Sequence, residues 1–370
     1  MNMNRLFTCL CLSLLFNLVQ AQLPIPEYQK GKAILSGTIA NYHPNDNLIF
    51  KIGAPNIVMG TAETLYPTVE SDGSFTINIP LYHHTQVRMM IGNADLVILL
   101  SPEKETNVAI NLSNPPGKQF VFSGQYATIN NEWCQPELIT KIPPVYSDGD
   151  LLDSIVGISA NEFKKRCINQ YKRYVTHNSA QLQFSEDTRT LANLSCAFDC
   201  LENLQATHYC LQTAYQKKEN ITREQAFAAF LDVYLPDDFH NYLKDFPVNH
   251  PLALYCYNYR NVVMDLYDTH KDPLAYEKNL LKNAPLTKEE QTLIHQYETA
   301  FKAGISFQQE SELMALSAKY FKENDQFRWE SFSKAKERLS NIIQDSTSLI
   351  VDYIRAIYMR SSFYNLQPLT

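Results

Sequence analysis

The stretch DGSFTINI at residues 72–79 decides the first half of the fold. Asp72 and Gly73 form a pair that favours a tight hairpin turn, because glycine readily adopts the positive φ that such turns need. From Phe75 onward, apolar and polar residues alternate. A period of two places one face of a strand on a core and the other in solvent. The sequence therefore predicts a turn followed by a half-buried strand.

The β pattern extends to both sides of this stretch. Apolar residues alternate again at residues 35–39 and 48–52, and further short strands are predicted at 108–112 and 120–122. Residues 96–100 are a continuous apolar run, which predicts a central strand buried on both faces. Short strands at this spacing, separated by turn residues, favour a β-sandwich.

Helical signals replace the β pattern after Gly124. Three capping boxes, in which a helix start satisfies its own amides, are predicted to begin at Ser159, Thr222 and Thr287. Apolar residues recur at helical spacing in several later segments, which span residues 163–174, 255–266, 313–321 and 349–357.

The predicted fold class is therefore α+β, with a β-sandwich-like domain followed by an irregular all-α domain. The predicted boundaries are residues 22–124 for the sandwich and 151–370 for the helical domain. Residues 125–150, which hold several prolines and Gly149, are predicted to be a linker and the start of the helical region.

The first 21 residues have the pattern of a secretory signal peptide. Arg5 is the positive start, residues 6–19 are largely apolar, and Val19 and Ala21 occupy the two positions that a signal peptidase reads. We predict cleavage after Ala21 and export to the periplasm or cell envelope. The alternative is a membrane anchor, for which the apolar run is short. No later segment is long and apolar enough to span a membrane, so none is expected after cleavage.

The amino-acid composition excludes some classes of binding partner. The chain has 370 residues, 45% of them hydrophobic, with 32 Lys plus Arg against 39 Asp plus Glu and a net charge of -7. Nucleic acids and anionic membrane surfaces need clustered cations, so we expect neither as a partner. The 22 tyrosines and 19 phenylalanines mostly follow the predicted periodicities, which favours packing over a glycan- or peptide-binding groove.

Six cysteines remain after the predicted cleavage, and thiol chemistry is the first activity to consider in an exported protein. No Cys-x-x-Cys is present. Cys196 and Cys200 share a face inside a predicted helix, away from the N-terminal dipole that lowers a thiol pKa. We expect buried, inert thiols and leave any disulfide pairing open among Cys134, Cys167, Cys196, Cys200, Cys210 and Cys256.

No metal or cofactor site is predicted. Cys196, Cys200, His208 and Cys210 have suitable chemistry, but one continuous helix would spread them over roughly 21 Å. The sequence signals no break in that helix.

Two other groups are weaker candidates. His83 and His84 are neighbours on a predicted strand and face opposite ways. Asp148, Asp150 and Asp153 lack the other ligands of a calcium loop, so a helix-capping loop is favoured. No catalytic, cofactor-binding or metal residue is therefore assigned, and no familiar catalytic motif is found.

Several short motifs together resemble one protein family. They occur, in this order, at Gly37-Thr38-Ile39, Asp72-Gly73-Ser74-Phe75, Ile79-Pro80-Leu81, Leu100-Ser101-Pro102-Glu103-Lys104, Phe122-Ser123-Gly124 and Ile129-Asn130-Asn131-Glu132. Residues 33–132 resemble the N-terminal β domain of TlpA-type, thioredoxin-like thiol–disulfide oxidoreductases exported by Bacteroides-type bacteria, and the resemblance extends loosely to Thr370. Glu103 stands where that family more often has glycine.

The resemblance implies a function without implying a catalytic residue. In the family a thioredoxin domain with Cys-x-x-Cys follows the helical segment, and no position here matches it. We therefore predict a non-catalytic binding or accessory module, with a protein or small-molecule partner in the cell envelope. The alternative is a truncated or split oxidoreductase that acts with a separately encoded thioredoxin domain. Pro368 and Thr370 favour truncation, because they suit a helix end and a further helix start.

Overall fold

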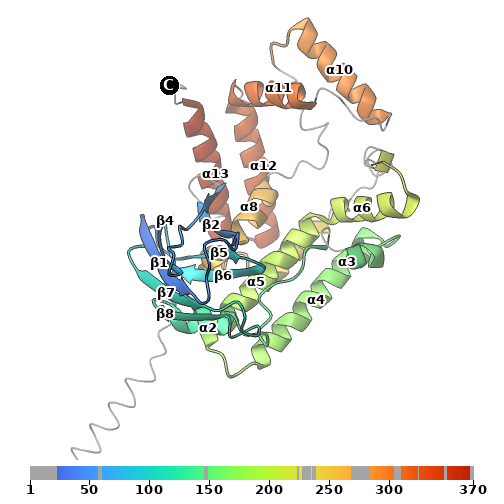
Figure 1. The fold of residues 1–370 in the computed structure, drawn as a ribbon. Helices are drawn as coiled ribbons and strands as arrows, with labels where there is room; N and C mark the ends of the chain where they lie inside the picture. The colour runs from blue at the N-terminus through green and yellow to red at the C-terminus, as the bar shows by residue number, and fades with distance from the viewer. Residues whose placement is uncertain are drawn as a thin grey trace, which may run out of the picture.

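The protein is α+β, as predicted, with a β-sandwich followed by helices (Figure 1). The computed structural model describes residues 23–56, 61–145, 149–222, 225–226, 235, 239–267, 284–303, 310–323, 325–345 and 348–366. The predicted signal peptide and the chain end at residues 367–370 lie outside them. No helix among these residues is long and apolar enough to cross a membrane.

The sandwich consists of two four-stranded sheets. One has the order β4-β1-β7-β8, from β4 (Ser74–Leu81), β1 (Gly31–Ile39), β7 (Glu105–Ile110) and β8 (Phe120–Gly124). The other has the order β3-β2-β5-β6, from β3 (Thr61–Leu65), β2 (Phe50–Asn56), β5 (Thr85–Ile91) and β6 (Ala94–Leu100). Only β1 and β7 pair in parallel among the described strands. Apolar side chains from both sheets share one buried cluster.

The predicted turn and half-buried strand are confirmed. Gly73 has φ 81°, and the Ser74 amide donates to the Asp72 carboxylate over 2.9 Å. In β4, Phe75 and Ile79 are buried in the sandwich core. The Asp-Gly pair therefore sets the register of β4 against β1 by fixing where the strand begins.

The prediction of a central strand at residues 96–100 is half wrong. These residues lie in β6, which is an edge strand. Its end is nevertheless buried on both faces: Ile98 and Leu100 point into the sandwich core, whereas Leu99 belongs to the core of the helical region. The run is therefore apolar because the helical region covers the outer face of β6, and not because β6 is central in the sheet.

Helix α2 (Ala127–Trp133) closes the sandwich against the helical region. The Asn130 carboxamide accepts from the Leu99 amide over 2.7 Å and donates to the Leu99 carbonyl over 3.1 Å. The Asn131 carboxamide does the same with Phe122, over 2.8 and 2.9 Å. The next residue, Glu132, accepts from the Ser185 amide and hydroxyl at the start of a later helix. Three consecutive side chains therefore join both sheets to the helical region.

The helices pack around one large apolar cluster. The longest pair, α4 (Ala160–Ala180) and α5 (Glu186–Gln205), lie side by side (Figure 1). The others are α3 (Gly149–Ser154), α6 (Thr207–Glu219), η2 (Phe239–Asp245), η3 (Pro251–Tyr255), α8 (Tyr259–Tyr267), α10 (Lys288–Lys302), α11 (Glu310–Glu323), α12 (Asp325–Ile343) and α13 (Leu349–Leu366). Helices α10 and α11 project from the rest and have a small apolar cluster of their own (Figure 1).

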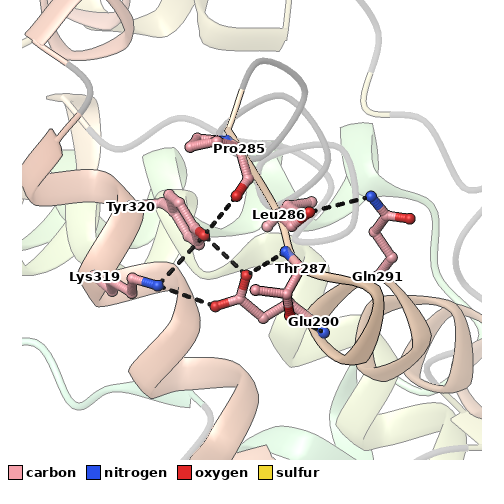
Figure 2. A network of polar contacts seen from close by, with 7 residues as sticks. All are labelled: Pro285, Leu286, Thr287, Glu290, Gln291, Lys319 and Tyr320. Atoms are coloured by element: carbon pink, nitrogen blue, oxygen red, sulfur yellow. Dashed lines mark hydrogen bonds and ion pairs between the residues drawn. The ribbon is translucent and has the colours of Figure 1, made fainter.

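The three capping boxes are confirmed at their first residues. Ser159 accepts from the Glu162 amide, and Thr222 and Gln225 exchange reciprocal bonds. At Thr287 the amide donates to the Glu290 carboxylate over 2.8 Å, and the Thr287 hydroxyl accepts from the Glu290 amide over 3.2 Å (Figure 2). The same carboxylate accepts from Lys319 and Tyr320 on α11 (Figure 2). One cap therefore also fastens α10 to α11.

The helix that was predicted to be continuous from residue 196 to 210 is broken. Helix α5 ends at Gln205 and α6 begins at Thr207, because Ala206 turns the chain and the Thr207 hydroxyl donates to the Leu204 carbonyl over 2.6 Å. No glycine or proline stands near Ala206, so the sequence does not mark this break.

The turn at residues 101–104 holds Glu103 in an unusual backbone conformation. Glu103 has φ 58°, in the left-handed region that glycine adopts at least cost. Its carboxylate accepts from the Lys32 amide over 2.9 Å. A Cβ at Gly31 would lie 2.4 Å from the same carboxylate, so Glu103 and Gly31 fit as a pair.

Residues 23–29 run from the helical region to the sandwich. Leu23 is buried in the helical core, and its amide donates to the Asp187 carboxylate at the start of α5. The Tyr255 hydroxyl donates to the Pro24 carbonyl over 2.8 Å. At the other end, the Gln29 amide donates to the Tyr82 carbonyl just after β4.

Candidate functional site

A cleft of about 380 Å³ lies where the sandwich meets the helical region. One wall is the outer face of β5 and β6. The opposite wall is built from the end of α2, residues 138–141, the middle of α5 and residues 257–258. Clefts of this size at the junction of two structural units are the usual place for small-molecule sites.

Charged side chains of the sandwich line the first wall. The Arg88 guanidinium binds the Asp95 carboxylate through two hydrogen bonds, Nε to Oδ1 over 2.7 Å and Nη2 to Oδ2 over 2.6 Å. The two residues are diagonal neighbours on the β5–β6 hairpin, where Arg88 lies opposite Val97 and Asp95 lies opposite Met90. The pKa of Asp95 is lowered, mainly by the bonds from Arg88. This pair is a rigid, bidentate feature of the wall.

Lys141 reaches the same carboxylate from the other side of the cleft. Its ammonium lies 4.0 Å from Asp95 Oδ2, which is beyond hydrogen-bond distance, and its side chain is 63% exposed. Among the described residues, the Lys141 ammonium has no closer carboxylate. Its charge also slightly lowers the pKa values of Asp199 and Glu202.

Asp199 forms the floor of the cleft. It stands in the middle of α5, where nearly every neighbour is apolar, and only 5% of it is exposed. One carboxylate oxygen accepts from the Ile142 amide over 2.7 Å, and the other accepts from the Asn258 carboxamide. Burial raises the pKa of Asp199 to about 6, against the lowering effect of these bonds. The carboxylate is therefore held in place rather than free to move a proton.

Glu202 lies one turn further along α5, behind this floor. It accepts from the Asn261 carboxamide over 2.9 Å. Burial raises its pKa to about 7, and the charges of Asp199 and Asp265 add to the increase. Two carboxyl groups one helical turn apart thus titrate far above their ordinary range.

The second wall is an extended segment, residues 138–145, which lies along α4 and α5. The Asn178 carboxamide exchanges bonds of 3.0 and 2.8 Å with the amide and carbonyl of Ile139. Asn203 accepts from the Val145 amide and donates to the Pro143 carbonyl. Together with Asp199, these side chains bind the backbone of a segment that the sequence predicted to be linker. The prolines keep it extended, and the helices supply its hydrogen bonds.

The cysteines are placed in the helical core. Cys167, Cys196, Cys200, Cys210 and Cys256 are buried, Cys134 is half-buried, and all six are free thiols. Burial raises the pKa of Cys167 and of Cys256 to about 12, and it raises those of Cys196 and Cys200 further. The thiols of Cys167, Cys196, Cys200 and Cys256 are therefore protonated at physiological pH, and a protonated thiol is a poor nucleophile.

The metal candidates of the sequence analysis are not brought together. In the part of the chain that the structure describes, no three His, Cys, Asp or Glu side chains are grouped to hold an ion. His83 is buried and bonds the His84 carbonyl, whereas His84 bonds the Tyr126 hydroxyl. Asp153 pairs with Lys217 over 2.6 Å, and Asp148 lies outside the described residues.

The sequence analysis missed the groups that define the cleft. Arg88, Asp95 and Lys141 belong to no motif, because their proximity depends on how the sandwich meets α5. Asp199 did leave a signal: it is a carboxylate inside the apolar run of residues 194–201. A charged residue on a fully buried helix needs a partner, so its position alone points to a polar site.

Comparison with known proteins assigns no activity to this geometry. No protein-family model matches the chain, and no match is found among curated proteins or solved structures.

Proposed function

We propose that the chain is an exported, non-catalytic binding module that holds a small polar ligand in the cleft between the sandwich and the helical region. The observation that carries the proposal is the cleft itself: about 380 Å³, with ion-paired walls and a buried carboxylate as its floor. A volume of this size suits a ligand of roughly ten to twenty non-hydrogen atoms rather than a polymer.

Binding is favoured over catalysis because Asp199 and Arg88, two of the charged groups of the cleft, already have partners within the protein. Both oxygens of Asp199 accept hydrogen bonds, and Arg88 is tied to Asp95. Ser195 contacts the Cys256 thiol, whose pKa burial raises to about 12, so this neighbour does not serve as a base. A nucleophile needs a base that is oriented toward it.

Rigid walls also support the proposal. Asn130 fixes the end of β6, and Asn178 and Asn203 fix residues 138–145 on the opposite side. Walls that are in place before the ligand arrives reduce the entropy lost on binding. The alternative, a partner for a separately encoded thioredoxin domain, remains a prediction that no contact described above favours.

Equilibrium dialysis tests the proposal. The chain without its first 21 residues is dialysed against a mixture of amino acids, dipeptides, mono- and disaccharides and nucleosides, and retained compounds are identified by mass spectrometry. A Thr140→Trp variant fills the cleft, and Thr176→Trp on the exposed face of α4 is the matched control. We expect retention by the wild type and the control and loss in Thr140→Trp. Retention that survives Thr140→Trp would place binding elsewhere.

A further inference from the structure

Asp95 and Lys141 have hydrogen-bonding capacity that their contacts within the protein do not use. An ionised carboxylate accepts about four hydrogen bonds, and Arg88 supplies two of those of Asp95. The Lys141 ammonium has three donors, and 4.0 Å separates it from Asp95. An acceptor and a donor of opposite charge therefore stand side by side, and a ligand can lie alongside the pair and bind both.

The charges of the cleft sum to zero at neutral pH. Arg88 and Lys141 are positive, and Asp95 and Asp199 are negative once the pH exceeds about 6. A ligand with one net charge would leave that charge uncompensated inside the cleft, which is costly. A ligand that carries one positive and one negative group avoids this cost.

Two of the three aromatic residues that line the cleft are buried. Phe120 and Trp133 are only 7% and 6% exposed, because they pack into the cores on either side. Tyr257 is the third and is half-buried, so the cleft has one partly exposed ring and no broad apolar face. The cleft instead offers charge at its wall and amide groups around it.

We propose that the ligand is a zwitterion, the α-ammonium and α-carboxylate of a free amino acid, with the carboxylate on Lys141 and the ammonium on Asp95. This inference rests on the proposed function. The two ligand charges are one carbon apart, so they can meet the ammonium and the carboxylate that face each other over 4.0 Å. Arg88 keeps Asp95 ionised and oriented while the ligand binds.

Thermal-shift and calorimetric titrations with blocked compounds test this inference. The probes are the common L-amino acids, their N-acetyl and carboxamide derivatives, and glucose and maltose as neutral polar controls. We expect at least one free amino acid to bind and both of its blocked derivatives to bind at least tenfold more weakly. Lys141→Gln should weaken binding of the free amino acid by at least tenfold. Lys104→Gln, at an exposed turn of the sandwich, should leave that binding unchanged.

The outcomes separate the two proposals. Equal binding of free and blocked amino acids, or binding of the sugars alone, overturns the zwitterion and leaves the cleft as a binding site. Binding that is insensitive to Lys141→Gln also overturns it. No binding by any probe overturns the zwitterion, whereas the wider dialysis mixture with Thr140→Trp decides the proposed function separately. Lys141 is mostly exposed, so its variant retains the fold.

Discussion

Asn130 and Asn131 are adjacent in the chain, yet their carboxamides hold edge strands of two different sheets. Asn130 pairs with both backbone groups of Leu99 in β6, and Asn131 pairs with both backbone groups of Phe122 in β8. Each carboxamide forms the two backbone bonds that one residue of a neighbouring strand would form, so it covers part of an otherwise open edge. One helical turn thus covers part of an edge strand in each sheet.

Asn130→Asp should destabilise the protein by about 2 kcal/mol, because the Leu99 carbonyl loses its donor at a buried site and faces a carboxylate oxygen instead. Urea unfolding measures the change. Asn114→Asp is the matched control, since Asn114 donates to the Lys118 carbonyl at an exposed turn and should cost less than about 0.5 kcal/mol. Equal stability of the two variants would contradict the strand-like role of Asn130.

Stability should fall as the pH rises from about 4 to 7. Burial raises the pKa of Asp199 from 3.8 to about 6 and that of Glu202 from 4.5 to about 7. In that window the folded state binds more protons than the unfolded state, so raising the pH favours unfolding. The effect of Asp199 is at most about 3 kcal/mol, at about 1.4 kcal/mol for each pKa unit.

Thermal unfolding between pH 4 and pH 8 checks this direction. Asp199→Asn should flatten the decline below pH 6, and Glu202→Gln should flatten the part near pH 7. The opposite result is a stability that rises with pH in the wild type but not in the two variants. It would show that the hydrogen-bond partners of Asp199 and Glu202 lower the pKa values of these residues more than burial raises them.

The segment of residues 138–145 should resist both proteolysis and hydrogen exchange, although the sequence predicts a linker there. The Ile142 and Val145 amides donate to Asp199 and Asn203, which are buried on α5. Asn203→Ala removes the acceptor of Val145, so its amide should exchange at least about tenfold faster, corresponding to about 1.4 kcal/mol. Thr176→Ala on the outside of α4 is the control. Rapid exchange of both amides in the wild type would refute the docking of this segment.

The buried thiols should not react with iodoacetamide in the folded protein at pH 8. Burial raises the pKa of Cys167 and Cys256 to about 12, so the reactive thiolate is scarce and shielded. Mass spectrometry should find alkylation of these residues only after urea unfolding. In an insulin-reduction assay the wild type should match a cysteine-free variant. Alkylation of Cys196 or Cys200 in the folded protein would contradict the prediction that these thiols are inert.

Glu103 and Gly31 should be energetically coupled. Gly31→Ala alone places a Cβ against the Glu103 carboxylate and should cost about 1–3 kcal/mol, in the range of overpacked sites. Glu103→Gly removes the side chain that the new Cβ would meet, and it also removes the left-handed strain. In that background, Gly31→Ala should reduce stability by at least about 1 kcal/mol less than it does in the wild type. A double-mutant cycle measures the coupling, and additive effects would show that Glu103 moves aside freely.

Local features of this fold are predictable from the sequence, because each is set by neighbouring residues. The Asp72-Gly73 turn, the half-buried strand after it and the caps at Ser159 and Thr287 are of this kind.

Features that depend on distant neighbours could not be predicted. The apolar run of β6 looks the same whether a strand or a helix covers it, so its edge position was missed. The break at Ala206 has no glycine or proline to mark it. The cleft joins Arg88 of the sandwich to Lys141 and Asp199 only through the packing of α2 against both β6 and α5, and no spacing along the chain records that packing.

The hydroxyl of Tyr255 binds the carbonyl of Pro24, a residue 231 positions earlier. This bond imposes an order on how the protein is assembled. Residue 24 leaves the ribosome long before residue 255 has been synthesised, and Asp187, the partner of the Leu23 amide, also emerges late. Contacts of such large sequence separation form slowly, after local structure. The first described residues of the chain are therefore among the last to form their native contacts. Residues that lead into the sandwich gain these contacts only after the helical region has been synthesised and folded.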